Sequence, residues 1–204
     1  MTFAILGTGG HAKSVYDIVK NKKKIYFFDK QNKFFKFNDR KFIVESEHLL
    51  IKNYRKRISK IIIAIGDNKI REKKYNLLKK NKFKFATLIH PKSYCSYGSK
   101  IGEGSVVMPG SLVNTDTVIG NNCIINSNAS IDHDCLIKDH THICPGVIIG
   151  GNVKIGKKVV IGSQSFVSNN IKICDNVIIA PGSIVLKNIT KPGVYNGNIL
   201  IKPQ

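Results

Sequence analysis

The pattern of apolar positions changes near residue 85, and the second part of the chain follows a strict six-residue period. Every sixth residue from Ile101 to Val185 is Ile or Val, and a small or β-branched residue such as Ser105 or Ala129 stands four places after each of these anchors. Such a period is typical of a parallel β-helix, in which three hexads make one triangular coil and anchors eighteen residues apart stack into a buried column. The pattern predicts about five coils over residues 86–190 and a C-terminal tail at 191–204.

The first part of the chain mixes short apolar runs with helical patterns and predicts a small α/β domain over residues 1–85. The predicted elements are strands at 3–6, 24–28 and 60–66 and helices at 13–20 and 68–80. The turn from Gly7 to Ala12 fits the G-x-G-x-x-G/A pattern of a phosphate-binding βαβ unit, and Asp29 has the spacing of an acid that binds ribose hydroxyls. Any tight strand-to-helix turn can carry such glycines, but Asp29 and the strand that leads to Gly66 favour nucleotide binding. Because the region is short, we expect one nucleotide rather than a dinucleotide.

Composition adds restrictions on partners and location. The net charge of +20 comes mainly from Lys and Arg between residues 20 and 84. No zinc finger, RNA-binding aromatic motif or arginine-rich arm accompanies it, so we expect polyanionic small molecules such as nucleotide sugars or coenzyme A rather than nucleic acid. The five cysteines form no CxxC pair, which favours free thiols. With no apolar run near the roughly 18 residues of a membrane span and no signal-peptide pattern, a cytoplasmic protein is expected.

Titratable residues gather in one segment of the repeat, IDHDCLIKDHTHICPG at 131–146. The hexad register places its three histidines, His133, His140 and His142, outside the anchor column. A histidine flanked by Asp132 and Asp134 suits a general base, and we expect His133 to titrate near the ordinary imidazole pKa of about 6.5. His140 is expected on the solvated surface.

These motifs resemble those of the sialic-acid O-acetyltransferase family of sugar O/N-acyltransferases. The resemblance is carried by GTGGHAKSVYDI, IAIGDNKIR, ATLIHPKSY, IDHDC and GGNVKIGKKVVIG. Within the family, the chain is most similar to acetyl-CoA-dependent N-acetyltransferases of nucleotide-linked 4-amino-4,6-dideoxy sugars, as in bacillosamine biosynthesis. The resemblance implies a small Rossmann-like domain that holds the nucleotide sugar, a left-handed β-helix, and a homotrimer with active sites between neighbouring copies.

Site residues follow from the resemblance by position. The implied substrate contacts are Gly9, Gly10, His11, Asp29 and Gly66. The implied catalytic base is His133, with Asp134 as its acidic partner, and the implied acetyl-CoA contacts are His142, Gly151, Ser163 and Pro181. For acyl transfer from a thioester, a backbone N–H near residues 150–151 is the natural donor to the oxyanion. No metal is implied. The family commonly has Glu where this chain has Asp134, and the end YNGNILIKPQ lacks the Gly-x-Pro-Ala stretch of many relatives.

We therefore expect transfer of acetyl to the 4-amino group of a nucleotide-linked sugar by direct attack, with a histidine as general base. One alternative is O-acetylation of sialic acid or another sugar hydroxyl, which has less need of the nucleotide-binding turn. Another is a zinc-dependent hydratase, which needs imidazoles that converge from separate coils, whereas the three here lie within ten residues. A non-catalytic basic scaffold is a third alternative.

Overall fold

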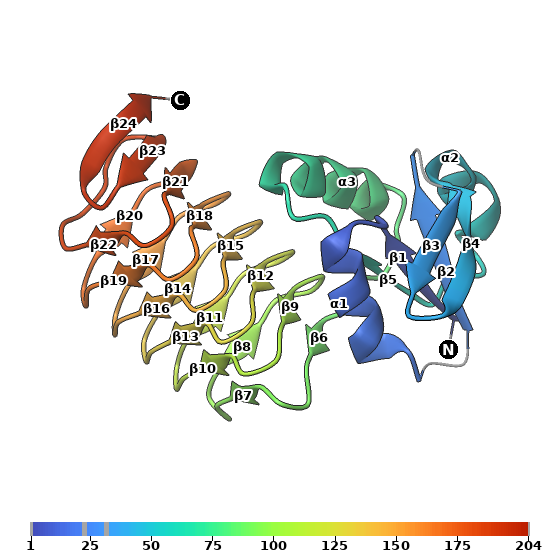
Figure 1. Ribbon diagram of the computed structural model, residues 1–204, viewed down its shortest axis with the longest axis horizontal. Coiled ribbons are helices and arrows are strands. Elements are labelled where there is room, and N and C mark those ends of the chain that lie inside the picture. Colours follow the sequence, from blue (N-terminus) through green and yellow to red (C-terminus); the bar gives the residue numbers. More distant parts are fainter. Residues whose placement is uncertain (1, 22–23, 31–32, 204) are drawn as a thin grey trace. The chain divides into compact units, whose positions relative to one another are not determined.

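The computed structural model describes residues 2–21, 24–30 and 33–203. The chain forms two compact units, residues 1–86 and 87–204. Figure 1 shows the first as a sheet with helices and the second as a stack of coils. None of the helices in the described residues is long and apolar enough to cross a membrane.

A five-stranded sheet forms the centre of the N-terminal unit, in the order β3-β4-β2-β1-β5. Its strands are β1 (Thr2–Leu6), β2 (Lys24–Asp29), β3 (Phe34–Phe37), β4 (Arg40–Ser46) and β5 (Lys60–Ile63). Strand β1, which lies inside the sheet next to its edge strand β5, pairs in parallel with both β2 and β5. Its last four residues are buried, as expected for a parallel strand covered on both faces. The carboxyl ends of β2, β1 and β5 therefore meet at one edge of the sheet.

Helices connect these strands: α1 (Gly10–Val19), α2 (Glu47–Leu49), the π-helical turn η1 (Leu50–Tyr54) and α3 (Asn68–Lys80). α3 spans the predicted residues, and the Asp67 side chain caps it by accepting the N–H of Ile70 at 2.8 Å. α1 begins at Gly10 rather than at residue 13, because Gly9 has the extended backbone of an N-cap. The β3–β4 hairpin and the α2–η1 segment were not predicted, since their short Phe- and Lys-rich pattern has no sustained period.

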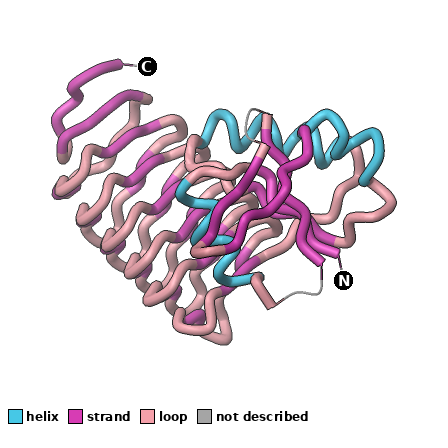
Figure 2. Tube along the Cα trace, turned by 45° about the vertical axis from the view of Figure 1, so that its right-hand side comes forward, coloured by secondary structure: helices cyan, strands magenta, loops and turns pink. Residues whose placement is uncertain are grey.

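Residues 87–204 form a left-handed parallel β-helix whose short strands recur once per hexad (Figures 1 and 2). The first face contains β7 (Tyr94–Cys95), β10 (Leu112–Val113), β13 (Ser130–Ile131), β16 (Ile148–Ile149), β19 (Phe166–Val167) and β22 (Ile184–Val185). The second face contains β8 (Lys100–Ile101), β11 (Val118–Ile119), β14 (Leu136–Ile137), β17 (Lys154–Ile155) and β20 (Lys172–Ile173). The third face contains β6 (Leu88–Ile89), β9 (Val106–Val107), β12 (Ile124–Ile125), β15 (His142–Ile143), β18 (Val160–Ile161), β21 (Val177–Ile179), β23 (Gly193–Asn196) and β24 (Ile199–Pro203).

The predicted anchor column forms the core of this unit. Ile101 is partly buried, and every later anchor to Val185 is buried. Each lies beside the anchor eighteen residues away, as Ile125 lies beside Val107 and Ile143. The β-helix inferred from the six-residue period is thus confirmed.

The small residues four places after the anchors line the corners, where they also satisfy backbone groups. Ser105 is fully buried, and its hydroxyl donates to the Gly120 carbonyl at 2.7 Å while accepting the Cys123 N–H at 2.9 Å. Cys123 and Cys135 occupy the same corner position as buried free thiols. Hydroxyl groups at these corners therefore link one coil to the next without breaking the apolar column.

Each turn between strands contains one residue with left-handed backbone. Positive φ recurs at every sixth residue from Gly104 to Gly182. Gly, Asn and Asp hold most of these positions because they adopt this conformation at the lowest cost. Asp134, with φ 59°, and His140, with φ 62°, belong to this series. The left-handed backbone of the turn therefore sets the direction in which the Asp134 and His140 side chains leave the coil.

The segment predicted as a C-terminal tail contains two strands. β23 pairs in parallel with β21, and β24 pairs antiparallel with β23. The third face therefore extends beyond the hexad repeat, with the apolar side chains of Ile199 and Ile201 exposed on its last strand.

Candidate active site

His133 and Asp134 form a pair in the turn between β13 and β14, at the corner between the first and second faces. The His133 Nδ1 lies 2.7 Å from Asp134 Oδ2. Because an ionised carboxylate only accepts hydrogen bonds, Nδ1 carries the proton and donates to Asp134. Nε2 of the neutral ring is then the basic nitrogen. Asp134 thus orients the imidazole in the way that a general base requires.

Asp132 supports this pair from the other side. Its Oδ1 accepts the backbone N–H of His133 at 2.8 Å and the side-chain amide of Asn114 at 3.0 Å. These two hydrogen bonds lower the pKa of the Asp132 carboxyl group. Its second oxygen lies 3.9 Å from His133 Nε2. The imidazole therefore lies between two carboxylates, and the turn that carries it is tied to the coil before it.

These carboxylates shift the titration of His133. The hydrogen bond with Asp134, followed by the charge of Asp132, raises the pKa of His133 above its ordinary value of 6.5. The sequence had suggested an unperturbed imidazole, so the structure differs from that expectation. The reason is that a negative charge in direct contact favours the protonated ring. The side chain is 54% exposed, so solvent screens part of this effect.

Gly151 lies directly behind the His133 ring, one coil further along. A Cβ atom on Gly151 would come within 2.7 Å of His133 Cε1 and 2.8 Å of Nε2. Only glycine leaves room for the ring in this position. The resemblance had implied Gly151 as an acetyl-CoA contact, and the structure gives it an additional part in seating the imidazole.

The backbone hydrogen bonds between coils exclude one of the two N–H groups expected near residues 150–151 to donate to the oxyanion. Gly150 donates its N–H to the Val167 carbonyl at 2.9 Å, so this group is already engaged. Gly151 remains as the candidate donor of the two, and it lies against the His133 ring.

His142 begins β15 on the third face and contacts Asn126. Its Nε2 lies 3.1 Å from Asn126 Nδ2. Asn126 Oδ1 accepts the N–H of Ser127, so the Asn126 amide nitrogen donates to the ring. His142 is therefore held half-buried on a different side of the coil from His133.

His140 differs from the expectation of a solvated side chain, which was wrong. It is only 7% exposed, and its Nδ1 lies 2.9 Å from the side-chain amide of Asn122, one coil before. The left-handed turn directs the ring along the corner and onto the neighbouring coil rather than into solvent. His140 is thus a structural residue, and its removal is expected to affect stability rather than turnover.

The remaining implied acetyl-CoA contacts, Ser163 and Pro181, lie at the corner between the third and first faces. Gly182 donates its N–H to the Ser163 carbonyl at 2.8 Å, which stacks the two turns. Within one chain, three of the residues implied for the coenzyme, His142, Ser163 and Pro181, therefore occupy a face and a corner that differ from the corner of His133, whereas the fourth, Gly151, lies beside His133.

The implied nucleotide-sugar contacts lie at the carboxyl edge of the N-terminal sheet. Gly9 and Gly10 follow β1 and start α1, and added Cβ atoms there would meet nothing within 4 Å. Asp29 ends β2 and accepts the Thr8 hydroxyl at 2.7 Å. Gly66 follows β5. Because these three strands are neighbours, the structure brings these residues together where parallel sheets bind ligands.

Arg71 is a residue of this edge that the sequence analysis missed. It lies on α3 and is 1% exposed, although Lys and Arg around it face solvent. Its guanidinium donates to the carbonyls of Ile65 and Gly66 at 3.1 and 2.8 Å and to Asn68 Oδ1 at 2.6 Å. The sequence did contain a signal for its burial. Arg71 stands at the three- and four-residue spacing of the side chains that form the buried face of α3, which are Asn68, Arg71, Tyr75 and Leu78.

His11, in the first turn of α1, has an unusual environment. Burial and the nearby charge of Arg71 lower its pKa to about 4. Its Nε2 is shielded from solvent and has no hydrogen-bond partner among the described residues. The imidazole is therefore neutral at physiological pH.

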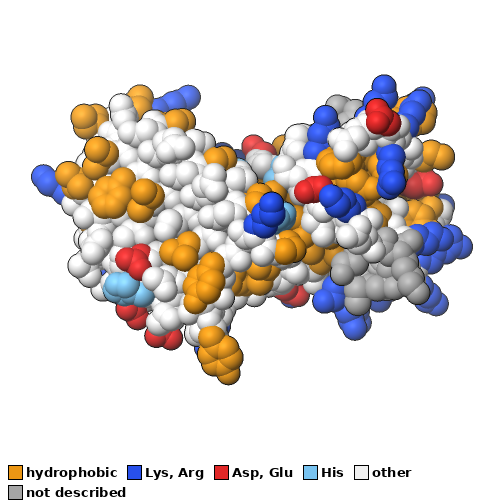
Figure 3. Space-filling model, turned by 60° about the horizontal axis from the view of Figure 1, so that its bottom comes forward, with side chains coloured by type: hydrophobic (Ala, Val, Ile, Leu, Met, Phe, Trp, Pro, Cys, Tyr) orange, Lys and Arg blue, Asp and Glu red, His pale blue; other side chains and the backbone are white. Residues whose placement is uncertain are grey.

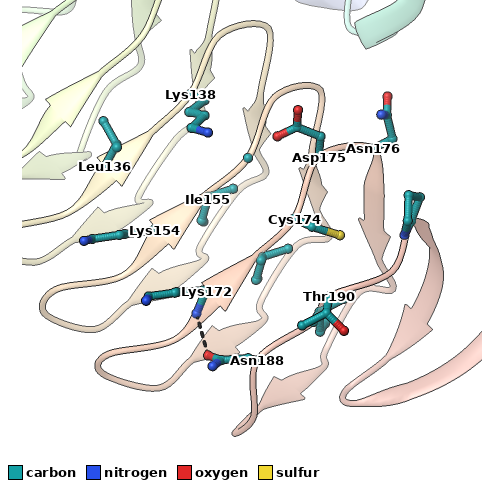
Figure 4. A pocket seen from close by; sticks show the side chains of 14 residues that line it. Leu136, Lys138, Lys154, Ile155, Lys172, Cys174, Asp175, Asn176, Asn188 and Thr190 are labelled. Carbon is teal, nitrogen blue, oxygen red and sulfur yellow. Dashed lines mark hydrogen bonds between the residues drawn. The ribbon is translucent and has the colours of Figure 1, made fainter.

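A separate groove of about 750 Å³ runs along the second face, where the chain returns after β22 (Figure 4). Lys138, Lys154 and Lys172 line it together with Asp175, and Asn188 accepts the backbone N–H of Lys172 at 2.8 Å. None of the residues implied by the resemblance lines this groove. In the part of the chain that the structure describes, no group of three or more His, Cys, Asp or Glu is arranged to hold a metal ion.

Two family models match the chain. The PglD N-terminal domain model matches residues 2–78. The bacterial transferase hexapeptide model, which represents six repeats, matches residues 98–133, 134–169 and 152–187.

Known proteins with these domains are similar to the chain. The UDP-N-acetylbacillosamine N-acetyltransferase of Bacillus subtilis strain 168 is 31% identical over 108 residues, which are 52% of this chain and 50% of that protein. The chain thus spans about half the length of this curated relative.

Solved structures match over almost the whole chain. The acetyltransferase domain of PglB from Neisseria gonorrhoeae FA1090 has a TM-score of 0.90 at 30% identity, with 98% of both chains covered. That domain has also been solved in complex with acetyl coenzyme A. A variant of perosamine N-acetyltransferase from Caulobacter crescentus, in complex with CoA and GDP-perosamine, has a TM-score of 0.87 at 26% identity, with 96% of this chain and 94% of that chain covered.

Replacing Asp134 by Asn should lower the pKa of His133 toward its ordinary value. The change removes the interaction that raises this pKa most, while Asp132 keeps a smaller effect. The pKa is measured by NMR titration of the imidazole, with the resonance assigned from a His133→Ala variant. Asp116→Asn is the matched control, because Asp116 holds the same left-handed turn position one coil before. An unchanged pKa in Asp134→Asn would contradict the pairing.

Proposed function

Because the chain belongs to the hexapeptide-repeat sugar acyltransferases with a PglD-type N-terminal domain, we propose that it is an acetyl-CoA-dependent N-acetyltransferase of a nucleotide-linked 4-amino-4,6-dideoxy sugar. One observation carries the proposal: His133 is oriented by Asp134, rests against Gly151 and leaves Nε2 as its basic nitrogen. The same chain carries a glycine turn and Asp29 at the edge where an α/β sheet binds nucleotides.

The proposed reaction is direct acyl transfer. The sugar amine attacks the thioester carbonyl of acetyl-CoA, and His133 Nε2 takes the proton that leaves the nitrogen as the C–N bond forms. Asp134 stabilises the resulting imidazolium. The C–S bond then breaks, and the proton on the imidazolium can pass to the departing coenzyme A thiolate. The Gly151 N–H is the candidate donor to the oxyanion of the tetrahedral intermediate. No step requires a covalent enzyme intermediate.

The raised pKa of His133 has a consequence for this mechanism. A general base must be deprotonated before it accepts a proton, so activity should rise with pH through an apparent pKa above 6.5. The carboxylates that orient the ring also stabilise its charged form. They reduce the neutral fraction at a given pH and favour proton transfer in the transition state.

An amine acceptor is supported by the relatives, whose names describe N-acetyltransferases of bacillosamine and perosamine sugars. The experiment that tests the function follows release of free coenzyme A thiol with UDP-, TDP- and GDP-linked 4-amino-6-deoxy sugars and with sialic acid as acceptors. We expect turnover with at least one nucleotide-linked amino sugar. Turnover with sialic acid alone would make the protein an O-acetyltransferase and overturn the proposed acceptor.

The proposed active enzyme is a homotrimer, since two of the implied coenzyme residues, Ser163 and Pro181, occupy a different corner of the chain from His133 and Gly151. The first face lies between these two corners and exposes apolar side chains, which Tyr94, Ile148, Phe166 and Ile184 contribute. Figure 3 shows such hydrophobic side chains on the surface of the β-helix. A neighbouring copy packed on this face would complete the site and bury these side chains. Closed cyclic assemblies repeat one such contact around an axis.

Replacing Phe166 by Glu should therefore weaken the trimer and reduce activity in proportion. Val118→Glu is the matched control, because both side chains are 37% exposed but Val118 points from the second face. Light scattering at the assay concentration gives the oligomeric state. A native protein that is a stable monomer would contradict the assembly, and an intact trimer with Phe166→Glu would exclude the first face as its interface.

Replacing His133 by Ala should lower kcat by roughly 10²–10⁴-fold, the usual contribution of positioned proton transfer. The fold and the assembly should persist, because a side chain that is 54% exposed leaves no cavity. The exposed His48→Ala serves as the control for loss of an imidazole elsewhere. Steady-state rates and thermal unfolding are compared for both variants, and near-normal turnover in His133→Ala would contradict the mechanism.

Replacing Gly151 by Ala should displace the His133 ring without unfolding the protein. The added Cβ would lie 2.7 Å from the ring, and the exposed side chain can swing into solvent to relieve the overlap. A displacement of about 1 Å commonly lowers a catalytic rate by about 10²-fold. Thr115→Ala, at the corner position one coil before His133, is the control. Unchanged kcat in Gly151→Ala would show that the ring position is not critical.

A further inference from the structure

The buried face of α3 contains a charged residue where an apolar one is expected. Arg71 is 1% exposed, and its guanidinium donates to Ile65, Gly66 and Asn68 in the turn after β5. A guanidinium remains charged in proteins, and burying a charge costs free energy. A simple hydrophobic contact would stabilise α3 at lower cost. The position therefore calls for a function of the charge or of its hydrogen bonds.

The turn that Arg71 holds lies beside the glycine turn. β1 and β5 are paired neighbours, and Ala64 donates its N–H to the Leu6 carbonyl at 2.8 Å, just before the two turns begin. Gly7, with φ 108°, approaches so closely that an added Cβ would lie 2.8 Å from the Ala64 carbonyl oxygen. Arg71 thus holds the turn after β5 beside the glycine turn after β1, which carries Gly9 and Gly10.

The electrostatics of this region favour an anion. The N-terminus of α1 carries a partial positive charge of about half a unit. Arg71 adds a full positive charge close enough to lower the pKa of His11 in the same turn. A negative group bound at this turn would be stabilised by both of these positive sources. The unpartnered His11 Nε2 also indicates a region that the chain alone does not complete.

We propose that Arg71 is a positioning residue of the nucleotide-sugar site, which holds the turn at residues 65–68 and supplies a fixed positive charge behind the glycine turn for the diphosphate. The inference rests on the proposed function, since it assigns Arg71 to the substrate of that site. Arg71 acts from within the protein and need not contact the substrate. Its loss should weaken binding of the diphosphate group and leave acetyl-CoA binding unchanged.

The test measures binding of UDP and GDP by calorimetry, with uridine and guanosine as probes that lack the diphosphate. Arg71→Met removes the charge and the hydrogen bonds to Ile65, Gly66 and Asn68, whereas Arg71→Lys keeps the charge but cannot span the same acceptors. Lys73→Met is the matched control, because it removes one exposed positive charge from the same helix. We expect Arg71→Met to weaken nucleoside diphosphate binding by roughly tenfold or more, with a smaller loss in Arg71→Lys and none in Lys73→Met.

A second measurement separates the charge from a purely structural role. NMR titration should show the pKa of His11 rising from about 4 in Arg71→Met and remaining low in Arg71→Lys and Lys73→Met. The KM for acetyl-CoA should be the same in all variants. If Arg71→Met does not fold, as judged by thermal unfolding, Arg71→Lys carries the test against Lys73→Met.

The outcomes distinguish the two proposals. If the native protein binds neither UDP nor GDP, the nucleotide-linked acceptor is overturned and the inference with it. If the native protein binds one of them and Arg71→Met binds it equally well, only the inference is overturned. Equal binding by native protein and Arg71→Lys, where Arg71→Met is unfolded, would also overturn it.

Discussion

Backbone pairing between residues eighteen positions apart is the interaction on which the candidate active site depends. It stacks the Ile and Val anchors into one column and places each outward side chain beside the residue one coil away. His133 meets Gly151 in this way, and Asp132 meets Asn114. The repeat that stabilises the unit therefore also sets the distances in the site. The apolar core that successive coils share can hold a polar corner in place. The exposed side chains of such a corner, here His133 and Asp134, contribute little to the burial that keeps the coils together.

The left-handed turn between strands sets the direction of the side chains that the eighteen-residue pairing places side by side. Asp134 and His140 hold equivalent turn positions in successive hexads, yet Asp134 is exposed and hydrogen-bonded to the His133 ring while His140 is buried against Asn122. The difference arises from the neighbouring coils and not from the turn itself. The turn aims each side chain along the corner, and the residues at that corner decide whether it meets solvent, a carboxylate or an amide. The same geometry explains why His133 has a raised pKa although it is largely exposed.

In our proposal, the N-terminal unit binds an anion through a different kind of interaction, a buried charge. Its glycine turn offers backbone at the start of α1, and a buried guanidinium lies behind it. Here the cost of burying charge is offset by hydrogen bonds within the protein, among them those to Ile65, Gly66 and Asn68, and, in our proposal, by the diphosphate of the substrate. The surface lysines that dominate the net charge of +20 can attract anions over a distance, but solvent screens them. A buried charge is screened much less and can act at a defined position.

The sequence by itself determined the β-helix, the anchor residues, the phosphate-type turn after the first strand and the outward placement of His133. The six-residue period could be read in this way because the residues that recur at it are the ones that are buried. Glycine turns and short strands could be predicted because they depend on residues that are neighbours along the chain. The tertiary structure alone decided that His140 is buried, that Gly151 seats the His133 ring and that Arg71 lies inside the N-terminal unit. Each of these depends on which side chain stands one coil away or across the sheet edge, and on the charges and carbonyls gathered there. No local pattern of apolar and polar residues records those contacts, since they arise only when segments distant along the chain pack together.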